Sequence, residues 1–369
     1  MADMTDCWYP TAFKHWDRET QETIARVLAS DRLTMGAETE AFEHELATYH
    51  HRKHAICVNS GSSANLIAVA ALSRHMYIRS AVVPALAWAT TYAPLVQYGI
   101  RFDLLDCDRT WNAPPYSGDF VDLFVGCSIL GNPARFDQEL PHARAFLNDN
   151  CEALGAELYG RPVGAYGDMA TLSFYHSHQL SAVEGGAVLT DDDDLADLCR
   201  MLRDHGLTRS FKKADVFEEE FDFKLFGYNV RPTDLYSAIG RVQLRQVDEQ
   251  RVARRKNWHH FFSGVQAARL PITAPTINAG FNPFSIHFTV EDRTKRNDLA
   301  YILRVNGIDC RMPVGGSFKR STYGREWVME NTPVADHIHD CGMFLGNAPF
   351  VIFPQIDRAI EVIKRALLP

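Results

Sequence analysis

Short apolar runs rich in β-forming residues alternate with segments of helical pattern between about residues 55 and 205. The seven apolar runs are HAICV, SAVVP, IRFDLL, DLFVGC, RAFLND, MATLSF and GAVLT, and helical patterns follow several of them, for example from Ser62 and over 195–203. Such alternation is typical of a mainly parallel sheet wrapped by helices. The sequence therefore predicts an α/β fold with a large ligand-binding domain, which we place at residues 31–248.

The pattern changes after about residue 250. A long helical segment is followed by the apolar run FSIHFTV, a helical pattern over 294–307 and a closing helical pattern over 356–367. This mixture predicts a smaller α+β domain over residues 249–369, with residues 1–30 as an N-terminal segment. A chain of 369 residues, of which 46% are hydrophobic, is long enough to form both cores.

Charge and composition argue against several classes of partner. The net charge of −8 is mild, and no basic stripe is present that would bind nucleic acid. No apolar run approaches the ~18 residues of a membrane span, and the first residues lack the pattern of a signal peptide. The eight cysteines lie far apart without a CxxC pair, as expected for reduced thiols. Together these features predict a cytoplasmic protein.

The stretch NSGSSANL places Gly61 and Ser62 at a predicted helix start. Free backbone NH groups and the helix dipole can hold a phosphate at such a position. The alternative is a serine-rich helix cap that binds no ligand.

Asp149 and Glu152 follow a predicted buried strand in the stretch FLNDNCEALGAE. Ligands bind outside the carboxyl ends of parallel strands, so both carboxylates are candidate site residues. An anionic Asp beside a pyridine nitrogen keeps that nitrogen protonated and makes the ring an electron sink. The alternative is that the two carboxylates cap the next helix.

Trp88 follows another predicted strand, where its indole could stack on a flat cofactor ring or pack in the core. His176 and His178 form an HxH pair, and alternate residues of a strand point to one side, as metal ligands would. No further ligand falls at a convincing spacing, so we expect no metal. His50 and the neighbouring histidines are expected on the solvated surface.

Nine segments together resemble the DegT/DnrJ/EryC1/StrS family of sugar aminotransferases, in the same order over nearly the whole chain. They are RLTMGAETEAFE, NSGSSANL, PALAWATTYAPLVQYG, LGNP, NDNCEALGA, SFYHSHQLSAVEGGAVLTDD, GYNVRP, GIDCR and GMFLGN. The resemblance implies fold type I of the pyridoxal-phosphate enzymes, with a mainly parallel seven-stranded α/β/α domain and a smaller α+β C-terminal domain. The family has its cofactor lysine shortly before a Gly-Glu-Gly-Gly turn. Here the residue six positions before Glu184 is His178.

The resemblance also implies how the cofactor is held. Its phosphate would contact Gly61, Ser62 and Ser173. Trp88 would stack on the ring, Asp149 would partner the pyridine nitrogen, and Glu152 would lie beside the ring hydroxyl.

Two further residues are assigned by the same resemblance. Asn229 would reach the phosphate from the neighbouring subunit, which implies a homodimer with shared active sites. Arg231 would meet a carboxylate of the substrate or co-substrate.

Histidine in place of lysine is typical of family members that remove a hydroxyl group from a sugar. Histidine moves protons but forms no Schiff base, so pyridoxamine or pyridoxal phosphate would be held non-covalently. The resemblance implies a 3-dehydratase that converts a nucleotide-linked 4-keto-6-deoxyhexose, above all GDP-4-keto-6-deoxymannose, into a 4-keto-3,6-dideoxy sugar. His178 would be the single acid and base, and L-glutamate would restore pyridoxamine phosphate. The implied pathway is colitose formation for lipopolysaccharide O-antigen.

Several alternatives stay open. A second lysine-less branch carries an iron–sulfur cluster on closely spaced cysteines, but no two cysteines here are nearer than Cys107 and Cys127. The chain could be an aminotransferase with an unusual base, or an enzyme whose lysine lies elsewhere, with Lys212 and Lys213 the nearest downstream. A catalytically silent member that binds ligand as a regulatory partner is the remaining alternative.

Overall fold

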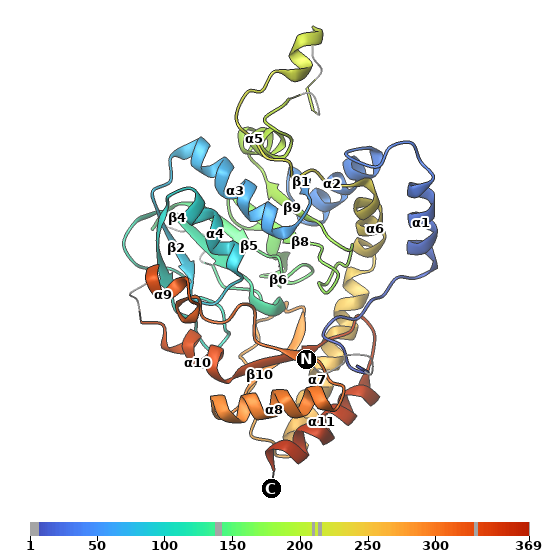
Figure 1. Cartoon of the computed structure of the whole chain (residues 1–369), viewed down its shortest axis with the longest axis vertical. Helices are drawn as coiled ribbons and strands as arrows, with labels where there is room; N and C mark the ends of the chain where they lie inside the picture. Colours follow the sequence, from blue (N-terminus) through green and yellow to red (C-terminus); the bar gives the residue numbers. More distant parts are fainter. Residues whose placement is uncertain (1–6, 137–141, 209–210, 213–215, 328–330, 369) are drawn as a thin grey trace.

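The described residues form a large and a small β-sheet, each covered by helices (Figure 1), and a two-stranded ribbon of β6 (Glu157–Leu158) and β7 (Arg161–Pro162). The computed structural model describes residues 7–136, 142–208, 211–212, 216–327 and 331–368. The large sheet uses strands from residues 54–190, and the small sheet uses strands from residues 285–346. The boundary expected at residue 248 lies at the start of α7 (Val247–Ala267), which packs with the small sheet.

The large sheet has the strand order β1-β9-β8-β5-β4-β2-β3. All seven apolar runs form strands of this sheet: β1 (His54–Val58), β2 (Ser80–Pro84), β3 (Arg101–Leu105), β4 (Val121–Cys127), β5 (Ala143–Asp149), β8 (Met169–Ser173) and β9 (Gly186–Thr190). The mainly parallel sheet is confirmed, since only β9 runs against the others. Because β9 returns beside β8, the connecting residues 174–185 lie at the carboxyl edge of the parallel strands.

Helices cover both faces of the large sheet. One face packs against α3 (Gly61–Met76), α4 (Ala89–Gln97) and α5 (Asp193–Arg203), and the other against α2 (Ala37–Tyr49) and α6 (Asp234–Leu244). Side chains of β1 alternate between these two cores, because Ile56 and Val58 lie with α3 whereas Ala55 and Cys57 lie with α2. Both faces of the strands are therefore apolar, as expected for a buried parallel sheet.

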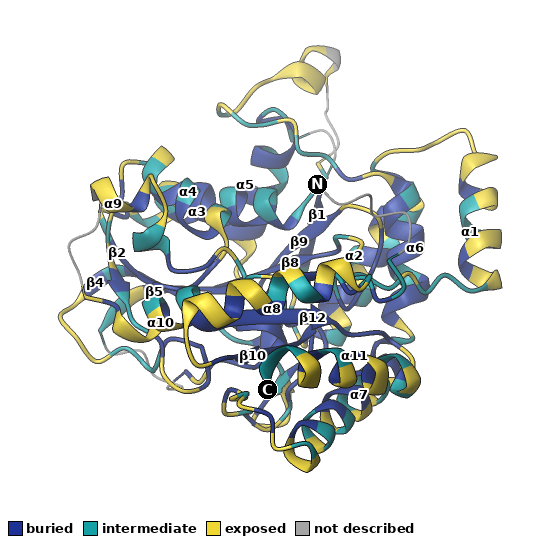
Figure 2. Ribbon diagram, turned by 60° about the horizontal axis from the view of Figure 1, so that its bottom comes forward, coloured by how far each residue is buried: buried dark blue, intermediate teal, exposed yellow. Residues whose placement is uncertain are grey.

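The small sheet is antiparallel, with the order β10-β12-β11. Its elements are β10 (Ser285–Thr289), α8 (Arg293–Val305), β11 (Cys310–Arg311), α10 (Pro333–Cys341), β12 (Gly342–Gly346) and α11 (Phe353–Leu367). Helices α7, α8 and α11 cover it and expose their outer sides (Figure 2). The N-terminal segment joins this core, because Tyr9 is fully buried in it and donates a hydrogen bond to the Gly346 carbonyl at 3.1 Å. Helix α1 (Arg18–Leu28) follows this segment and contacts α6.

One expectation about the surface was wrong. His50 is fully buried where α2 ends, although His51 beside it is exposed. Its ring packs edge-on against Tyr49 at 5.0 Å, and a Cβ added at Gly164 would lie only 2.5 Å from its Nδ1. The polar stretch HHRKH concealed this burial, because the chain turns from the helix into the sheet at His50.

Residues 216–227, with η4 (Phe217–Phe221), extend away from the body at the top of Figure 1. None of the helices in the described part of the chain has the length and apolar character needed to cross a membrane.

Candidate active site

A cavity of about 500 Å³ lies where the carboxyl ends of the large sheet meet the small sheet. The large-sheet side contributes Ser60, Gly61, Ser62, Asn65, Trp88, Thr90, Asp149, Cys151, Glu152, Ser173, Tyr175, Ser177, His178 and Glu184. The small-sheet side contributes Phe284, Arg311, Met312, Val314 and Phe344. The cavity thus brings together Gly61, Ser62, Trp88, Asp149, Glu152, Ser173 and His178, the residues expected from the sequence to serve one site.

The first turn of α3 forms one end of this cavity. Ser60 is the helix cap, and its Oγ accepts a hydrogen bond from the Ser63 NH at 3.1 Å. A Cβ added at Gly61 would lie 2.6 Å from Ser173 Cβ, so only glycine lets the helix start approach the end of β8 this closely. Ser62 Oγ lies 2.9 Å from Thr90 Oγ1. Ser60 is therefore the residue that caps the helix. Gly61, Ser62 and Ser173 form a cradle of NH and OH donors.

Asp149 is the last residue of β5 and is 3% exposed. Its Oδ2 accepts hydrogen bonds from Asn65 Nδ2 and Thr91 Oγ1, both at 2.8 Å, and its Oδ1 accepts one from the Cys151 NH at 3.1 Å. The chain then turns without starting a helix, so the helix-cap alternative was wrong. Three donors stabilise a carboxylate that faces the cavity.

Glu152 lines the same wall. Its Oε2 accepts a hydrogen bond from the Leu130 NH at 3.0 Å. Burial raises the pKa of Glu152 to about 7, and the charge of Asp149 adds to the shift. At neutral pH this carboxyl is therefore partly protonated and can donate a hydrogen bond to a ring oxygen.

Trp88 precedes α4 and is 55% exposed. The core-packing alternative was therefore wrong, because more than half of the residue is open to solvent and it lines the cavity. The loop after β11 approaches it closely, since a Cβ added at Gly315 would lie 3.2 Å from the Ala87 carbonyl oxygen and 3.9 Å from Trp88 Cε3. An exposed indole held at its edge is suited to stacking on a flat ring.

His178 lies in the loop 174–185 rather than on a strand. Strand β8 ends at Ser173, so His176 and His178 are not alternate residues of a strand, and His176 is exposed. The His178 ring packs edge-on against Phe284 at 5.2 Å. In the part of the chain that the structure describes, no group of three or more His, Cys, Asp or Glu could hold a metal ion.

The His178 imidazole is neutral near physiological pH. Burial lowers the pKa of His178 to about 4, although backbone groups of Cys151 and Ser173 partly oppose the shift. Its Nδ1 is buried and finds no hydrogen-bond partner among the described residues. A neutral imidazole with an unmet buried nitrogen is a candidate general base for a ligand in the cavity.

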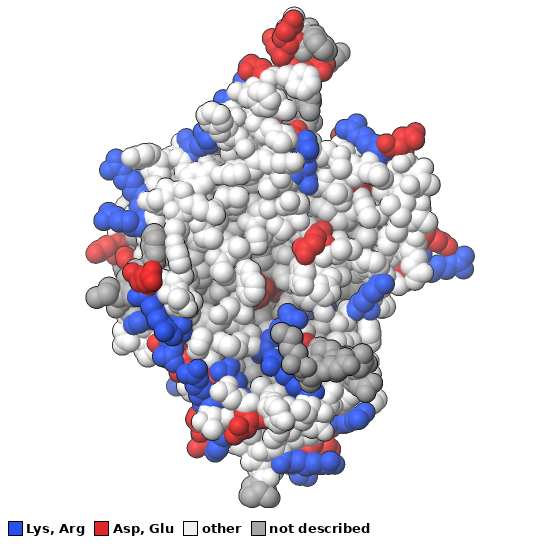
Figure 3. Space-filling model, in the orientation of Figure 1, with Lys and Arg blue, Asp and Glu red and all other residues white. Residues whose placement is uncertain are grey.

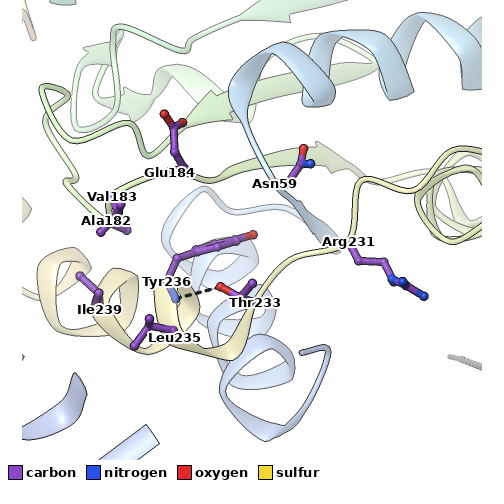
Figure 4. Close-up of a pocket in the computed structure, with 9 residues that line it drawn as sticks. All are labelled: Asn59, Ala182, Val183, Glu184, Arg231, Thr233, Leu235, Tyr236 and Ile239. Atoms are coloured by element: carbon purple, nitrogen blue, oxygen red, sulfur yellow. Dashed lines mark hydrogen bonds between the residues drawn. The ribbon is translucent and has the colours of Figure 1, made fainter. Parts of the chain in front are cut away.

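Asn229 and Arg231 lie outside this cavity. Asn229 is exposed and bridges with Asp204, and Arg231 Nη1 donates to Asp204 Oδ1 at 3.1 Å. Arg231 instead lines a second pocket of about 220 Å³, which shares Glu184 with the main cavity. In Figure 4 the guanidinium of Arg231 points away from the Tyr236 ring on the other side of this pocket.

Several lining residues were not predicted from the sequence. Asn65 lies one helical turn after Gly61 on α3, and that spacing is the one signal that could have indicated it. Phe284, Arg311 and Phe344 come from the small sheet, and no local pattern connects them with the α3 end of the cavity.

The residues present fit a pyridoxal-type cofactor. The cavity combines a donor cradle for a phosphate, an exposed indole, a buried carboxylate and a carboxyl with a raised pKa. No lysine lines it within the described residues. Such a cofactor would therefore be held by non-covalent contacts.

A large α/β unit and a small α+β unit with this cavity between them define a fold-type I pyridoxal-phosphate enzyme. The sequence matches the DegT/DnrJ/EryC1/StrS aminotransferase family over residues 14–117 and 127–364, and the chain belongs to this family. It is 34% identical to GDP-4-keto-6-deoxy-D-mannose 3-dehydratase of Escherichia coli O55:H7, over 96% of this chain and 99% of that protein.

Solved structures of GDP-4-keto-6-deoxymannose 3-dehydratase have the same fold as this chain. The Escherichia coli 3-dehydratase with bound hydrated pyridoxal phosphate aligns with a TM-score of 0.90 and 32% identity, over 96% of this chain and 99% of that one. A histidine-to-asparagine variant with bound GDP-perosamine aligns at 0.89, and a complex with a trapped pyridoxal-phosphate–glutamate geminal diamine at 0.88. Both are 31% identical over 96% of this chain and 100% of the other.

Proposed function

We propose that this chain is a 3-dehydratase of a nucleotide-linked 4-keto-6-deoxyhexose, most closely GDP-4-keto-6-deoxymannose, that uses pyridoxamine phosphate. The observation that carries the proposal is a cavity that has a neutral histidine, His178, and no lysine among the described residues that line it. The relatives that bear the name of this reaction match the chain over nearly its whole length. The product is a 4-keto-3,6-dideoxy sugar.

Side chains already on the cavity wall hold the cofactor. Gly61, Ser62 and Ser173 bind its phosphate, and Trp88 stacks on its ring. Asp149 pairs with the pyridine nitrogen, and Glu152 donates to the ring hydroxyl. When bound, the cofactor supplies an electron sink for negative charge at the carbon beside the ring.

His178 moves the protons. Because burial keeps it neutral, its imidazole takes a proton from the carbon beside the cofactor ring, and the resulting imidazolium protonates the departing C3 hydroxyl as water. One imidazole serves both steps, and Phe284 fixes the plane of its ring. Among the described residues, no lysine lines the cavity to form a Schiff base with the cofactor. This favours dehydration over amino transfer.

L-Glutamate is the amino donor that restores pyridoxamine phosphate. The relatives with bound GDP-perosamine and with a pyridoxal-phosphate–glutamate adduct support a GDP-linked sugar and glutamate as the two substrates. A product of this kind suits colitose formation for lipopolysaccharide O-antigen in the cytoplasm, where nucleotide sugars are made.

The active site is completed by a second copy of the chain. Asn229 lies outside the cavity of its own subunit, as expected of a residue that reaches the cofactor phosphate in the partner subunit. The middle of the face in Figure 3 carries few charged side chains, as expected for a surface that a second copy covers. Size measurement by light scattering tests the homodimer, and a monomer would contradict it.

Product analysis tests the reaction itself. The enzyme is incubated with pyridoxal phosphate, glutamate and GDP- or CDP-linked 4-keto-6-deoxyhexoses. A 3-deoxy product with release of ammonia is expected from the GDP-linked mannose derivative. Nitrogen retained on the sugar would instead identify an aminotransferase, and no 2-oxoglutarate would identify a silent member. Borohydride followed by mass spectrometry should find no cofactor adduct on any lysine, Lys212 and Lys213 included.

A further inference from the structure

Gln179 directly follows the proposed base, His178, and is 2% exposed. Its Nε2 donates hydrogen bonds to two main-chain carbonyl oxygens, that of Glu152 at 2.6 Å and that of Asn282 at 3.2 Å. Glu152 lies on the large-sheet side of the cavity, and Asn282 lies just before β10 of the small sheet. One buried amide therefore ties the loop of the base to both sides of the cavity.

The tip of the loop 174–185 depends on side chains for its position. Main-chain hydrogen bonds hold the stem of the loop, among them the bond from the His176 NH to the Val183 carbonyl at 3.0 Å. At the tip, Leu180 is fully buried in the core beside α2 and α6, but apolar packing has no direction. The hydrogen bonds of Gln179 are directional, so they can set the orientation of the tip.

A closed circuit of contacts links Gln179 with the base and with the Glu152 carboxyl. Glu152 Oε2 accepts a hydrogen bond from the Leu130 NH at 3.0 Å, and the Leu130 carbonyl accepts one from the Phe284 NH at 3.1 Å. The Phe284 ring packs edge-on against the His178 ring at 5.2 Å. The bond from Gln179 to the Glu152 carbonyl closes the circuit. The positions of the imidazole and of the carboxyl are therefore coupled.

This coupling matters for the proposed reaction, on which the inference rests. The imidazole acts at the carbon beside the cofactor ring, and the Glu152 carboxyl acts at the ring hydroxyl. A misplacement of about 1 Å can cost about 100-fold in rate. We infer that Gln179 is a positioning residue that holds the His178 imidazole and the Glu152 carboxyl in register on the same cofactor. Gln179 acts through these two neighbours, because it lies behind the cavity wall rather than on it.

The test compares two buried glutamines. Gln179→Met removes the donor at nearly constant volume. Gln243→Met is the matched control, because Gln243 is 1% exposed on α6 and its Nε2 donates to the His15 carbonyl at 3.2 Å, away from the cavity. Both variants lose a buried amide and should be destabilised to a similar extent. A difference between them in catalysis therefore reports the position of the base and not general stability.

The first measurement is the glutamate half-reaction, in which the bound aldehyde form of the cofactor becomes the amine form, followed by absorbance in single turnovers. Gln179→Met should lower the maximal rate by about 10- to 100-fold. The half-saturating glutamate concentration and the dissociation constant of pyridoxal phosphate should each change by no more than about threefold, because the residue touches neither ligand. Gln243→Met should keep the rate within about twofold of wild type.

The second measurement needs no ligand. Hydrogen exchange is followed by mass spectrometry in peptides that cover residues 174–185 of the cofactor-free protein. These amides should exchange about 10-fold faster in Gln179→Met, because the loss of a buried hydrogen bond makes local opening of the loop easier. Gln243→Met should leave their exchange unchanged.

The outcomes separate this inference from the proposed function. A half-reaction rate within about twofold of wild type in folded, cofactor-loaded Gln179→Met would overturn the inference, as would equal rate losses in both variants or a loss of glutamate affinity alone. If wild type completes the half-reaction but forms no 3-deoxy sugar, the proposed function fails while the rate comparison still tests Gln179. If wild type shows no half-reaction, hydrogen exchange decides: faster exchange over 174–185 in Gln179→Met supports the inference, and unchanged exchange overturns it.

Discussion

Asn65 Nδ2 donates a hydrogen bond to Asp149 Oδ2 at 2.8 Å, and both side chains are buried. The Asn65 amide is itself oriented, because its Oδ1 accepts a hydrogen bond from Thr171 Oγ1 at 2.7 Å. Thr91 supplies a second donor to the same carboxylate oxygen. Residues of α3, α4 and β8 thus fix the carboxylate at the end of β5 before any ligand binds.

Asn65→Leu should weaken both the fold and the cofactor site. The nearly isosteric leucine leaves Asp149 with one donor fewer and the Thr171 hydroxyl without its acceptor, which should lower the free energy of unfolding by about 1–3 kcal/mol. Cofactor affinity should fall as well, because the Asp149 carboxylate is no longer held in place. Urea unfolding and titration with pyridoxal phosphate measure the two effects. Gln97→Ala, an exposed position on α4, is the control, and an equal loss in both variants would contradict this account.

His178→Asn should strongly slow turnover while the cofactor still binds. The amide preserves polarity and approximate size but transfers no proton, so kcat should fall by about 10²–10⁴-fold. Single-turnover kinetics with the cofactor-loaded enzyme measure the loss. His176→Asn is the matched control two residues away, where the side chain is exposed and outside the cavity. Dehydration that continues unchanged in His178→Asn would remove this residue from the mechanism.

Much of the fold could be predicted because local patterns encode it. Alternating apolar runs indicated all seven strands of the large sheet, and the rule that ligands bind at strand carboxyl ends indicated Asp149 and Glu152. Resemblance to a family added His178 and Ser173. Arg311 escaped prediction because the contact between the small sheet and the cavity is long-range and leaves no local pattern. The ion pair of Arg231 with Asp204 could not be predicted from the sequence either, because it also joins residues far apart in the chain.

Glu152→Gln should stabilise the protein above neutral pH. The folded-state pKa of Glu152 is about 7, above the ordinary pKa of a glutamate side chain. Between this ordinary pKa and pH 7, the folded state therefore binds a proton that the unfolded state has released. Stability therefore falls as pH rises through this range, and the glutamine variant lacks this decline. At pH 8 we expect its free energy of unfolding to exceed that of wild type by about 1–3 kcal/mol. Urea unfolding without cofactor measures the difference, and a variant less stable than wild type at pH 8 would disprove the assignment.

His50→Leu should make the protein less sensitive to acid. Burial lowers the folded-state pKa of His50 to about 3, and neither ring nitrogen has a partner among the described residues. As pH falls from 6.5 toward 3, the unfolded chain binds a proton that the folded chain does not, so stability falls with pH over this window. At pH 5 this loss amounts to about 2 kcal/mol, which the leucine variant should not show. Free energies of unfolding at pH 7 and pH 5 measure the difference, with His259→Gln as the exposed control. Equal losses between pH 7 and pH 5 in wild type and His50→Leu would show that another group governs the acid response.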